Sequence, residues 1–380
     1  MKFLTLIIKN LLRNKRRTLL TVSSIMVSLF LVATLRTLLT ELQNPPETPD
    51  SALRLITRHR TSLFNVLPIA HKEKIAGIEG VEAVTGSMWF GGIYEDPSNF
   101  FANFAIDSKE FFQVHPDVMI SEAEKLAYLE DRTGAIAGDN LADRFGWKLG
   151  EKIFLDSNLF NFDPELTLRG IYREGPDSGN SLYFHWDYFN EALGNPGFTG
   201  TFALRTSSPE AIPLAAEKID ALFLNSTAPT KTETEKAFLL SFVEMMGDVQ
   251  FFITSIVSVV VFTIVLVAAN TMAMSIRERV REIGILKALG FRSAQVLGLL
   301  LGESMLLALL GALIGSWGAK LIFGSINMSA LTGGLMQRFS VTPGTLILCA
   351  FIGLFVGLIS AGIPAWQASR RPVVEAMRRR

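Results

Sequence analysis

The sequence predicts an α+β membrane protein with four transmembrane helices and a large α/β extracytoplasmic domain between the first and the second. Three observations predict this class. The 380 residues are 49% hydrophobic, with a mean hydropathy of +0.33, which is high for a soluble domain. The excess lies in four long apolar runs. A more polar stretch, residues 41–247, separates the first run from the other three.

Each apolar run is long enough to cross a bilayer, which takes about 20 residues. Two of the runs contain no charged residue over 249–276 and 339–369, and another, 293–319, carries only Glu303. A cleaved signal peptide is the alternative for the first run, although no A-x-A cleavage site follows it. We predict four spans and a short outer loop at 323–344. The spans are expected at 18–40, 248–275, 293–322 and 345–367.

Basic residues cluster in three segments, although the formal net charge is zero. Segments 1–17, 276–293 and 368–380 hold six, five and five Lys plus Arg residues, against three acidic ones. The positive-inside rule places all three in the cytoplasm, and so both termini of an inner (plasma) membrane protein. We expect an amphipathic N-terminal segment and a basic tail. The clusters lack the interleaved aromatic residues that stack on bases, so nucleic acid is not an expected partner.

The polar stretch predicts one exported domain of mixed structure. Strand-like and helix-like segments alternate near both of its ends. The central section is rich in Phe, Gly and Asn, which is typical of short strands and turns, so we expect an inserted β-rich subdomain at about 90–200. The predicted strands are 52–59, 81–90 and 201–206, and the predicted helices are 69–78 and 208–224.

Helix-compatible sequence begins at Thr232 and continues through the second span to Ile283. A helix of about 40 residues is about 60 Å long, roughly twice the hydrocarbon thickness of a bilayer. This continuity predicts a stalk helix that projects from the second span. The alternative is a break near Gly247 and Asp248 that leaves two separate helices.

Catalytic motifs are absent from the sequence. The dipeptide Gly-Lys, which a P-loop needs, occurs nowhere, and neither HExxH nor GxSxG is present. The four histidines are widely spaced, and the one cysteine, Cys349, lies inside the last apolar run. We therefore predict no catalytic, cofactor-binding or metal-binding residue, and no intramolecular disulfide.

Glycines at helix-packing spacing occur in the third and fourth spans. A GxxxG pair lets two helix backbones approach closely, and three pairs predict a packed bundle or a dimer. Glu303 is the one acidic residue inside a span, where it must face protein or water. A structural hydrogen bond to a neighbouring helix and a proton or substrate contact are both open for it. The pairs are Gly298 with Gly302, Gly311 with Gly315, and Gly353 with Gly357.

The connection between the second and third spans, SIRERVREIGILKALGFRSAQV, is charged and helix-compatible over 276–292. Ile276, Val280 and Ile283 share one face, and charges of both signs cover the rest. Glu278 with Arg281 and Arg279 with Glu282 are predicted i, i+3 ion pairs. A helix lying on lipid would carry mostly basic residues, so the mixed charge favours a docking surface for a cytoplasmic protein.

This connection resembles the signature of the FtsX and MacB superfamily of ABC transporter permeases, the type VII or mechanotransmission class. The motif REIGILKALG carries the resemblance, with GESMLLALLGALIG after it. The closing PAWQASRRPVVEAMRRR and the domain segment GDNLADRFGWKLGEKIFL are also similar to the family, as is the order of one span, an exported domain and three spans.

The resemblance implies a permease half that dimerises with an identical or paralogous chain and binds a separate ABC ATPase dimer, which binds ATP and Mg. MacB carries an ATPase domain before its first span, whereas this chain starts 17 residues before it, so a partner ATPase is expected. The family's coupling helix contacts the ATPase. The matching residues here are Arg281, Glu282, Gly284, Lys287, Ala288, Leu289 and Gly290, and Glu303 matches the family's acidic position in the third span. Arg277 and Glu278, just before this motif, are also expected to couple to the ATPase.

The function expected from the resemblance is mechanical coupling of ATP hydrolysis to export or extraction of an amphiphilic substrate, such as a peptide, lipid, lipoprotein or drug. An FtsX-like scaffold that controls a cell-wall hydrolase and a LolC/LolE-like lipoprotein-releasing permease are the alternatives. A pull-down distinguishes them. A periplasmic adaptor with an outer-membrane channel indicates efflux, a lipoprotein carrier indicates sorting, and a hydrolase indicates signalling.

Overall fold

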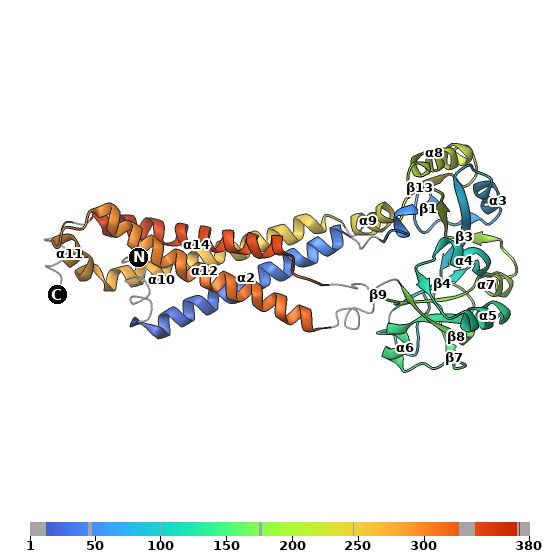
Figure 1. Cartoon of the computed structure of the whole chain (residues 1–380), viewed down its shortest axis with the longest axis horizontal. Helices are drawn as coiled ribbons and strands as arrows, with labels where there is room; N and C mark the ends of the chain where they lie inside the picture. The colour runs from blue at the N-terminus through green and yellow to red at the C-terminus, as the bar shows by residue number, and fades with distance from the viewer. Residues whose placement is uncertain are drawn as a thin grey trace. The chain divides into compact units, whose positions relative to one another are not determined.

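The computed structural model describes residues 13–44, 48–99, 101–174, 177–245, 247–326, 339–370 and 372. The chain divides into two units (Figure 1). The helical unit comprises Met1–Leu42, Gly247–Ile326 and Phe339–Arg380, and the lobe comprises Gln43–Met246 with Asn327–Arg338. Most of the predicted outer loop, the start of the predicted amphipathic segment and most of the basic tail lie outside the described residues.

The helical unit contains four helices that are long and apolar enough to span a membrane, which confirms the predicted spans. Hydroxyl side chains inside them bond to their own helix. Thr37 donates to the carbonyl of Ala33 at 2.8 Å, and Thr263 donates to that of Val259 at 2.8 Å, which satisfies these groups away from water. The helices are α2 (Lys15–Gln43), α10 (Val249–Glu278), α12 (Ser293–Ser325) and α14 (Pro343–Arg370), with the short α11 (Val280–Ala288) between α10 and α12.

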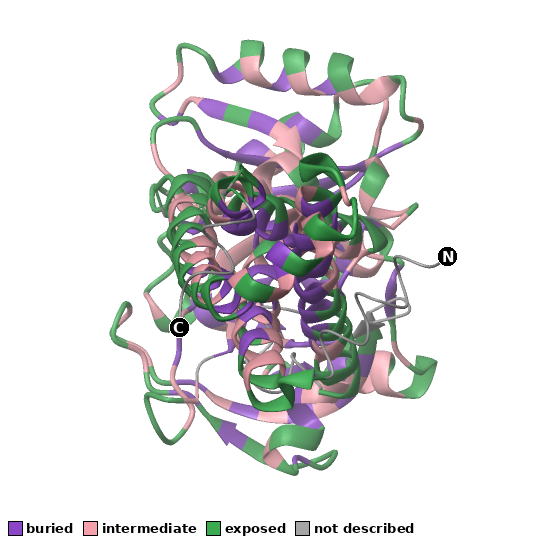
Figure 2. Ribbon diagram, turned by 90° about the vertical axis from the view of Figure 1, so that its left-hand side faces the viewer, coloured by how far each residue is buried: buried purple, intermediate pink, exposed green. Residues whose placement is uncertain are grey.

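Glycines let these helices pack closely. A Cβ atom added at Gly315 of α12 would lie 2.3 Å from the carbonyl oxygen of Met26 in α2. A Cβ at Gly311 would lie 2.7 Å from a side-chain carbon of Ile25. In Figure 2, where this unit is seen nearly end-on, buried residues lie between the helices and exposed residues lie outside. This GxxxG pair therefore joins α12 to α2 within one chain.

The pair in α14 packs against α12 in the same way. A Cβ at Gly353 would lie 2.7 Å from that of Ala312, and one at Gly357 would lie 2.7 Å from the Cα of Met305. Gly302 of α12 is half-buried. Gly298 is exposed, and a Cβ there would meet no described atom within 4 Å. Gly298 therefore makes no close helix contact within the described part of the chain, and of the two predicted roles for this pair the dimer contact stays a prediction.

The lobe is built on a mixed sheet of eleven strands in the order β13-β1-β12-β3-β4-β10-β6-β8-β5, with β7 and β9 paired to β8. β10 with β4 and β6 with β8 are parallel, and the other pairs are antiparallel. The strands are β1 (Arg54–His59), β3 (Val81–Trp89), β4 (Ala102–Ile106), β5 (Val118–Met119), β6 (Gly134–Gly138), β7 (Lys152–Phe154), β8 (Glu165–Glu174), β9 (Asp177–Ser178), β10 (Ser181–His185), β12 (Thr201–Thr206) and β13 (Thr230–Thr234). β2 (Leu67–Pro68) and β11 (Phe198–Thr199) form a separate pair.

Short helices cover the sheet and bury its apolar side chains. Leu55 of β1 and Phe202 of β12 belong to one buried cluster with Ile75 of α3 and Ile219 of α8. The strands and helices predicted at both ends of the domain are thus present. The helices are η1 (Ser51–Leu53), α3 (His71–Ala76), α4 (Ser108–Val114), α5 (Glu122–Glu130), α6 (Asp139–Phe145), α7 (Trp186–Ala192), α8 (Ala211–Phe223) and α9 (Glu235–Met245).

The Phe-rich central section forms a core of its own on the same sheet. The ring of Phe90 lies 5.4 Å from that of Phe184 and 6.2 Å from that of Phe189, edge to face, and all three residues are fully buried. The prediction of an inserted β-rich subdomain at about 90–200 describes this section only in part. Four helices, α4 to α7, lie in this section, and the pairing of β3 with β4 continues the sheet into it.

The predicted stalk helix is wrong. Thr232 lies in β13, α9 ends at Met245, and α10 begins at Val249. Gly247 has φ of +86°, a conformation that strongly favours glycine and ends a helix. The side chain of Asp248 accepts a hydrogen bond from the backbone N–H of Phe251 at 2.9 Å and caps α10. The break that the sequence left as the alternative is confirmed.

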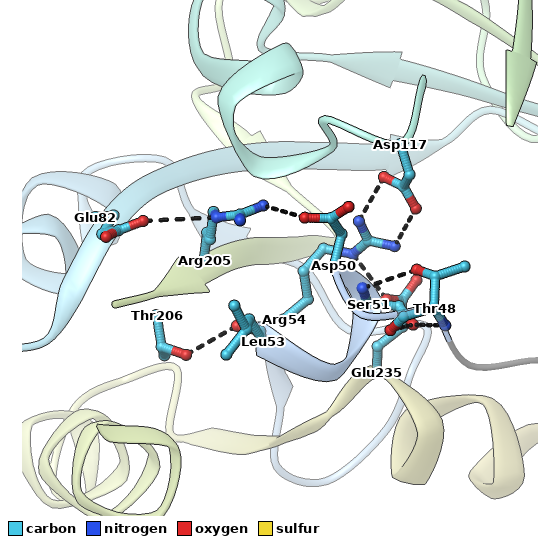
Figure 3. Close-up of polar contacts among 10 residues, drawn as sticks. All are labelled: Thr48, Asp50, Ser51, Leu53, Arg54, Glu82, Asp117, Arg205, Thr206 and Glu235. Carbon is cyan, nitrogen blue, oxygen red and sulfur yellow. Dashed lines mark hydrogen bonds and ion pairs between the residues drawn. The ribbon is translucent and has the colours of Figure 1, made fainter. Parts of the chain in front are cut away.

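Arg54, the first residue of β1, joins three segments of the lobe (Figure 3). Its guanidinium donates to both carboxylate oxygens of Asp117, at 2.6 and 2.9 Å, and to Glu235, the first residue of α9, at 2.8 Å. The side chain of Arg54 is 2% exposed. A buried cation requires such partners, because its desolvation is otherwise uncompensated. The strand that follows α2 in sequence and the helix that precedes α10 are therefore fastened to one buried group.

Burial and the charge of Arg54 together shift the pKa values of neighbouring groups. Burial raises the pKa of Asp117, but the hydrogen bond and charge of Arg54 outweigh burial and hold the pKa below its usual value. Burial, and then the charge of Arg54, lowers the pKa of His115 to about 3. Burial raises the pKa of Glu235, against the opposing effect of Arg54. The folded lobe therefore keeps His115 neutral.

We predict that replacing Gly315 by alanine destabilises the helical unit by about 1–3 kcal/mol, because the added methyl group meets backbone that cannot move aside. The thermal midpoint of the full chain in detergent should fall. Gly298→Ala is the matched control and should change it little. Equal effects of the two substitutions would contradict the assigned packing.

We predict that the lobe loses stability as the pH falls from 6.5 towards 3. The unfolded chain binds a proton at His115 in this window and the folded chain does not, so stability falls with pH. The protection factors of the β1 amides, which are their hydrogen-exchange rates corrected for the intrinsic rate at each pH, should fall over this range when measured on the full chain. His115→Gln should flatten the dependence, whereas Leu222→Gln, at an exposed position of α8, should leave it unchanged.

Candidate functional site

Charged residues gather at one end of the helical unit, which we call the basic end and define as residues 13–17, 276–293 and 369–370. The short helix α11 lies there, at the ends of α10, α12 and α14 (Figure 1). Hydrogen bonds join all three segments: Arg13 and Arg17 bind Glu282 and Glu278, and Lys287 binds the backbone carbonyl of Ser369. The basic segments that are far apart in the sequence thus meet at one place.

The path of the chain around α11 follows from two residues. Arg279, with φ of −103° and ψ of 9°, ends α10 and caps α11. Gly290, with φ of +93°, follows the end of α11 and permits the turn towards α12. The prediction of one helix over 276–292 is corrected by this break, because residues 276–278 complete α10 and α11 covers only Val280–Ala288.

One face of α11 is buried against its neighbours. Ile276 and Ile283 belong to a buried cluster with Val296 and Leu300 of α12 and Ala365 of α14. The predicted apolar face is therefore present, with Val280 half-buried beside it. Gly284 is also buried, so this position of the predicted coupling motif packs inward.

The acidic residues of this segment pair with α2 and with the residues just before it. Arg17 donates to Glu278 at 2.7 Å, and Arg13 donates to Glu282. The predicted i, i+3 pairs of Glu278 with Arg281 and of Arg279 with Glu282 are therefore replaced by longer-range pairs. These side chains are partly exposed, so each pair adds little stability. One pair joins the end of α10 to α2, and the other joins α11 to the residues just before α2.

Glu303 of α12 forms a buried ion pair with Arg279. One guanidinium nitrogen, Nη1, donates to both carboxylate oxygens, at 2.8 and 3.0 Å. The side chains are 9% and 5% exposed. Of the two interpretations open for Glu303, a bond to a neighbouring helix is the one the structure has. The sequence predicts Arg279 on the polar face, paired with Glu282, and that prediction is wrong. Its spacing from Ile276 and Ile283 is the signal that puts it on the buried face.

Lys287 fastens α11 to α14. Its Nζ donates to the carbonyl oxygen of Ser369, in the last turn of α14, at 3.0 Å. A cation at the C-terminus of a helix is favourable because the carbonyl groups there carry partial negative charge. Together with the pairs of Glu278, Glu282 and Arg279, this bond connects α11 to α2, α12 and α14.

The opposite face of α11 is exposed. Arg281, Ile285, Ala288 and Leu289 follow the i, i+4, i+7, i+8 spacing of one helix face. Ile285 is 47% and Leu289 73% exposed. We call these four residues the exposed face of α11. Among the predicted coupling residues, Arg277, Glu278 and Gly290 are also exposed, whereas Glu282 and Lys287 are half-buried.

We predict that Glu303→Leu destabilises the helical unit by about 3–5 kcal/mol, because Arg279 is left buried without this partner. The free energy of unfolding in detergent measures the effect. The double variant Arg279→Leu with Glu303→Leu should recover most of the loss. Arg277→Leu, at an exposed position, is the control. Additive losses in the double variant would show that the pair is not coupled.

The chain is similar to permeases along its length. It is 25% identical over 395 aligned residues to an uncharacterized ABC transporter permease, MJ1507, of Methanocaldococcus jannaschii, covering 99% of this chain and 97% of that protein. It is 27% identical to the uncharacterized ABC transporter permease YknZ of Bacillus subtilis, over 52% of this chain and 49% of YknZ. It is 36% identical to the macrolide export ATP-binding/permease protein MacB of Nitrobacter winogradskyi, over 29% of this chain and 16% of MacB.

Two solved domains are similar to part of the chain. The extracellular domain of YknZ covers 47% of the chain at 14% identity, with a TM-score of 0.37 and 98% of that domain aligned. The periplasmic region of MacB from Actinobacillus actinomycetemcomitans covers 50% at 11% identity, with a TM-score of 0.39 and 92% aligned.

Family models match both parts of the chain. The MacB-like periplasmic core domain matches residues 18–222, and the FtsX-like permease C-terminal region matches residues 254–373. The first match alone covers more than half of the 380 residues. The second includes the ion pair of Arg279 with Glu303 and the whole of α11. The protein therefore belongs to the FtsX/MacB superfamily of ABC transporter permeases.

Proposed function

We propose that this chain is the transmembrane subunit that couples ATP hydrolysis by a separate ATPase subunit to movement of an extracytoplasmic lobe, with the basic end in the cytoplasm. The movement drives export or extraction of an amphiphilic substrate. The observation that carries the proposal is the two-sided construction of α11. One side is fastened to the other helices, and the other side presents an exposed apolar surface.

The exposed face of α11 has the chemistry of a protein-docking surface. Ile285 and Leu289 supply apolar side chains, and Arg281 adds a charged rim, the arrangement found in protein interfaces. Leu289 projects at the end of the helix, beside Gly290. The ATPase subunit docks on this face. Glu278 and Glu282 serve instead to hold α11, because their carboxylates are engaged by Arg17 and Arg13.

The opposite side of α11 passes a displacement to the helices. The buried pair of Arg279 with Glu303 connects the junction of α10 and α11 to α12, and Lys287 connects α11 to the end of α14. A packed interface of this kind moves as a unit rather than deforming gradually. A push on α11 therefore reaches three spans at once.

The lobe receives the displacement through the two chain segments that join it to α2 and α10. Arg54 lies at the start of β1, shortly after α2, and Glu235 begins α9, which precedes α10. Because Arg54 binds Glu235 and Asp117 together, the two segments and the α4–β5 turn shift together. Gly247 serves as the pivot between α9 and α10, so transmission does not require one rigid rod.

An amphiphilic substrate is proposed by analogy with relatives named as macrolide exporters. Such a substrate partitions into the membrane surface and is handled at the lobe rather than carried through the spans. Glycine-mediated packing of α2, α12 and α14 is compatible with spans that transmit movement.

We predict that Leu289→Asp weakens ATPase docking at least about tenfold, because it places a charge in the centre of an apolar contact. The measurement uses the full chain in nanodiscs with the ATP-binding subunit that co-purifies from its native membrane. Stimulation of ATP hydrolysis by the chain should be lost. Arg281→Glu should reduce it as well, without disturbing the pairs that hold α11.

The matched control is Leu222→Asp, a substitution of the same type at a residue of α8 that is 51% exposed. It should leave stimulation unchanged. If Leu289→Asp and Arg281→Glu both retain full stimulation, the ATPase does not dock on the exposed face of α11. If no ATP-binding subunit co-purifies with the unaltered chain, coupling to a separate ATPase is contradicted.

A further inference from the structure

The faces of α12 and α14 that point away from the other helices are apolar. On each helix the exposed apolar side chains recur with the spacing of one helix face, and we call them the α12 row and the α14 row. An exposed apolar surface of this length marks a place where lipid or another protein makes contact. The α12 row contains Leu310, Ile314 and Leu321, and the α14 row contains Phe351, Phe355, Ile359 and Ile363.

Each row has an exposed tryptophan close to one of its ends, with a cation over the ring. Trp366 follows the α14 row, and the guanidinium carbon of Arg370 lies 4.5 Å from the centre of its ring. Trp317 lies on the same face as the α12 row, and Nζ of Lys320 is 5.2 Å from its ring centre. At these distances the ring face attracts the cation. Each pair thus joins an amphipathic ring to a positive charge.

The two tryptophans lie at opposite levels of the helical unit. α12 begins at the basic end and α14 ends there, so the two helices are antiparallel (Figure 1). Gly357 lies directly against the backbone of Met305. Trp366 is 9 residues past Gly357, towards the basic end, and Trp317 is 12 residues past Met305 in the other direction. At about 1.5 Å per residue, the tryptophans are about 32 Å apart along the helices.

This separation matches the hydrocarbon core of a bilayer, which is about 30 Å thick. The contact of Gly353 with Ala312 gives a similar separation, about 27 Å. Tryptophan collects at both membrane–water interfaces, because its ring is apolar and its N–H can donate to lipid oxygens. Lys and Arg side chains there extend towards the phosphate groups. Both pairs therefore have the chemistry and the spacing of anchors in two headgroup layers, with most of both rows between them.

We infer that the α12 row and the α14 row contact phospholipid, and that the pairs Trp317–Lys320 and Trp366–Arg370 bind the headgroups of opposite leaflets. A second copy of the chain is the other candidate for covering these faces. Contact between proteins gives no reason for two ring–cation pairs to be one hydrocarbon thickness apart, whereas anchoring in a bilayer requires that spacing. The inference does not depend on docking of an ATPase or on which end is cytoplasmic.

The test uses the full chain in vesicles of phosphatidylcholine with brominated acyl chains, which quench nearby tryptophan fluorescence. Bromine close to the headgroup should quench more than bromine near the chain ends. Trp317→Phe and Trp366→Phe should each remove about half of the quenching, because the other three tryptophans lie in the lobe. Trp89→Phe, at an exposed position of the lobe, is the matched control and should leave the quenching unchanged. Stronger quenching by the deep bromine, or an equal effect of Trp89→Phe, would overturn the inference.

A second measurement distinguishes lipid from a second copy of the chain. Phe355→Cys carries a spin label about midway between the two tryptophan levels, and the native Cys349 is buried, so the label goes to the introduced cysteine. In the same vesicles the label should collide with oxygen, which dissolves in hydrocarbon, far more often than with a water-soluble nickel chelate. Leu222→Cys, at an exposed position of the lobe, should show the reverse. A label at position 355 that meets neither reagent would assign this face to a contact between proteins and overturn the inference.

Discussion

Arg279 and Glu303 illustrate the constraint that organises the helical unit, which is that a charge removed from water must meet an opposite charge. The pair ties the end of α10 to α12 at the place where α11 begins. Because neither side chain can be buried alone without a large cost, the position of α11 is set by this contact. The apolar cluster around Ile283 and the bond of Lys287 to α14 then complete a junction of four helices. The exposed face of α11 consists of the residues that take part in none of these three contacts.

The lobe contains a second case of the same constraint. Arg54 is buried between Asp117 and Glu235, and its charge changes the protonation of the groups around it. Two of the buried arginines lie at junctions of the chain, Arg279 between two helices and Arg54 at the first residue of β1. The two parallel bonds of Arg54 to Asp117 add geometric specificity, and Nη1 of Arg279 contacts both carboxylate oxygens of Glu303. Each junction is therefore held in one arrangement, as a coupled movement requires.

Close backbone approach supplies the rigidity between these junctions. Gly315 brings α12 against α2, and Gly357 brings α14 against α12, so the backbones of three spans approach closely at these positions. Turns at glycines with positive φ separate some of these segments, namely Gly247 before α10 and Gly290 after α11. The chain thus alternates rigid packed segments with defined turns. This distribution supports transmission of force through helix packing rather than through one long rod.

The sequence by itself determined the four spans, the positions of the basic segments, the α/β class of the lobe and the family. These depend on composition and short-range periodicity, which local residues fix. Only the tertiary structure decided which partner each charge meets. Arg13 and Glu282 are 269 residues apart, and Arg279 and Glu303 are 24 apart, so spacing along one helix led to the wrong pairs. The sequence alone also could not decide whether the helix breaks at Gly247. A single glycine can lie inside a helix or end it, and the outcome depends on the structures that flank it.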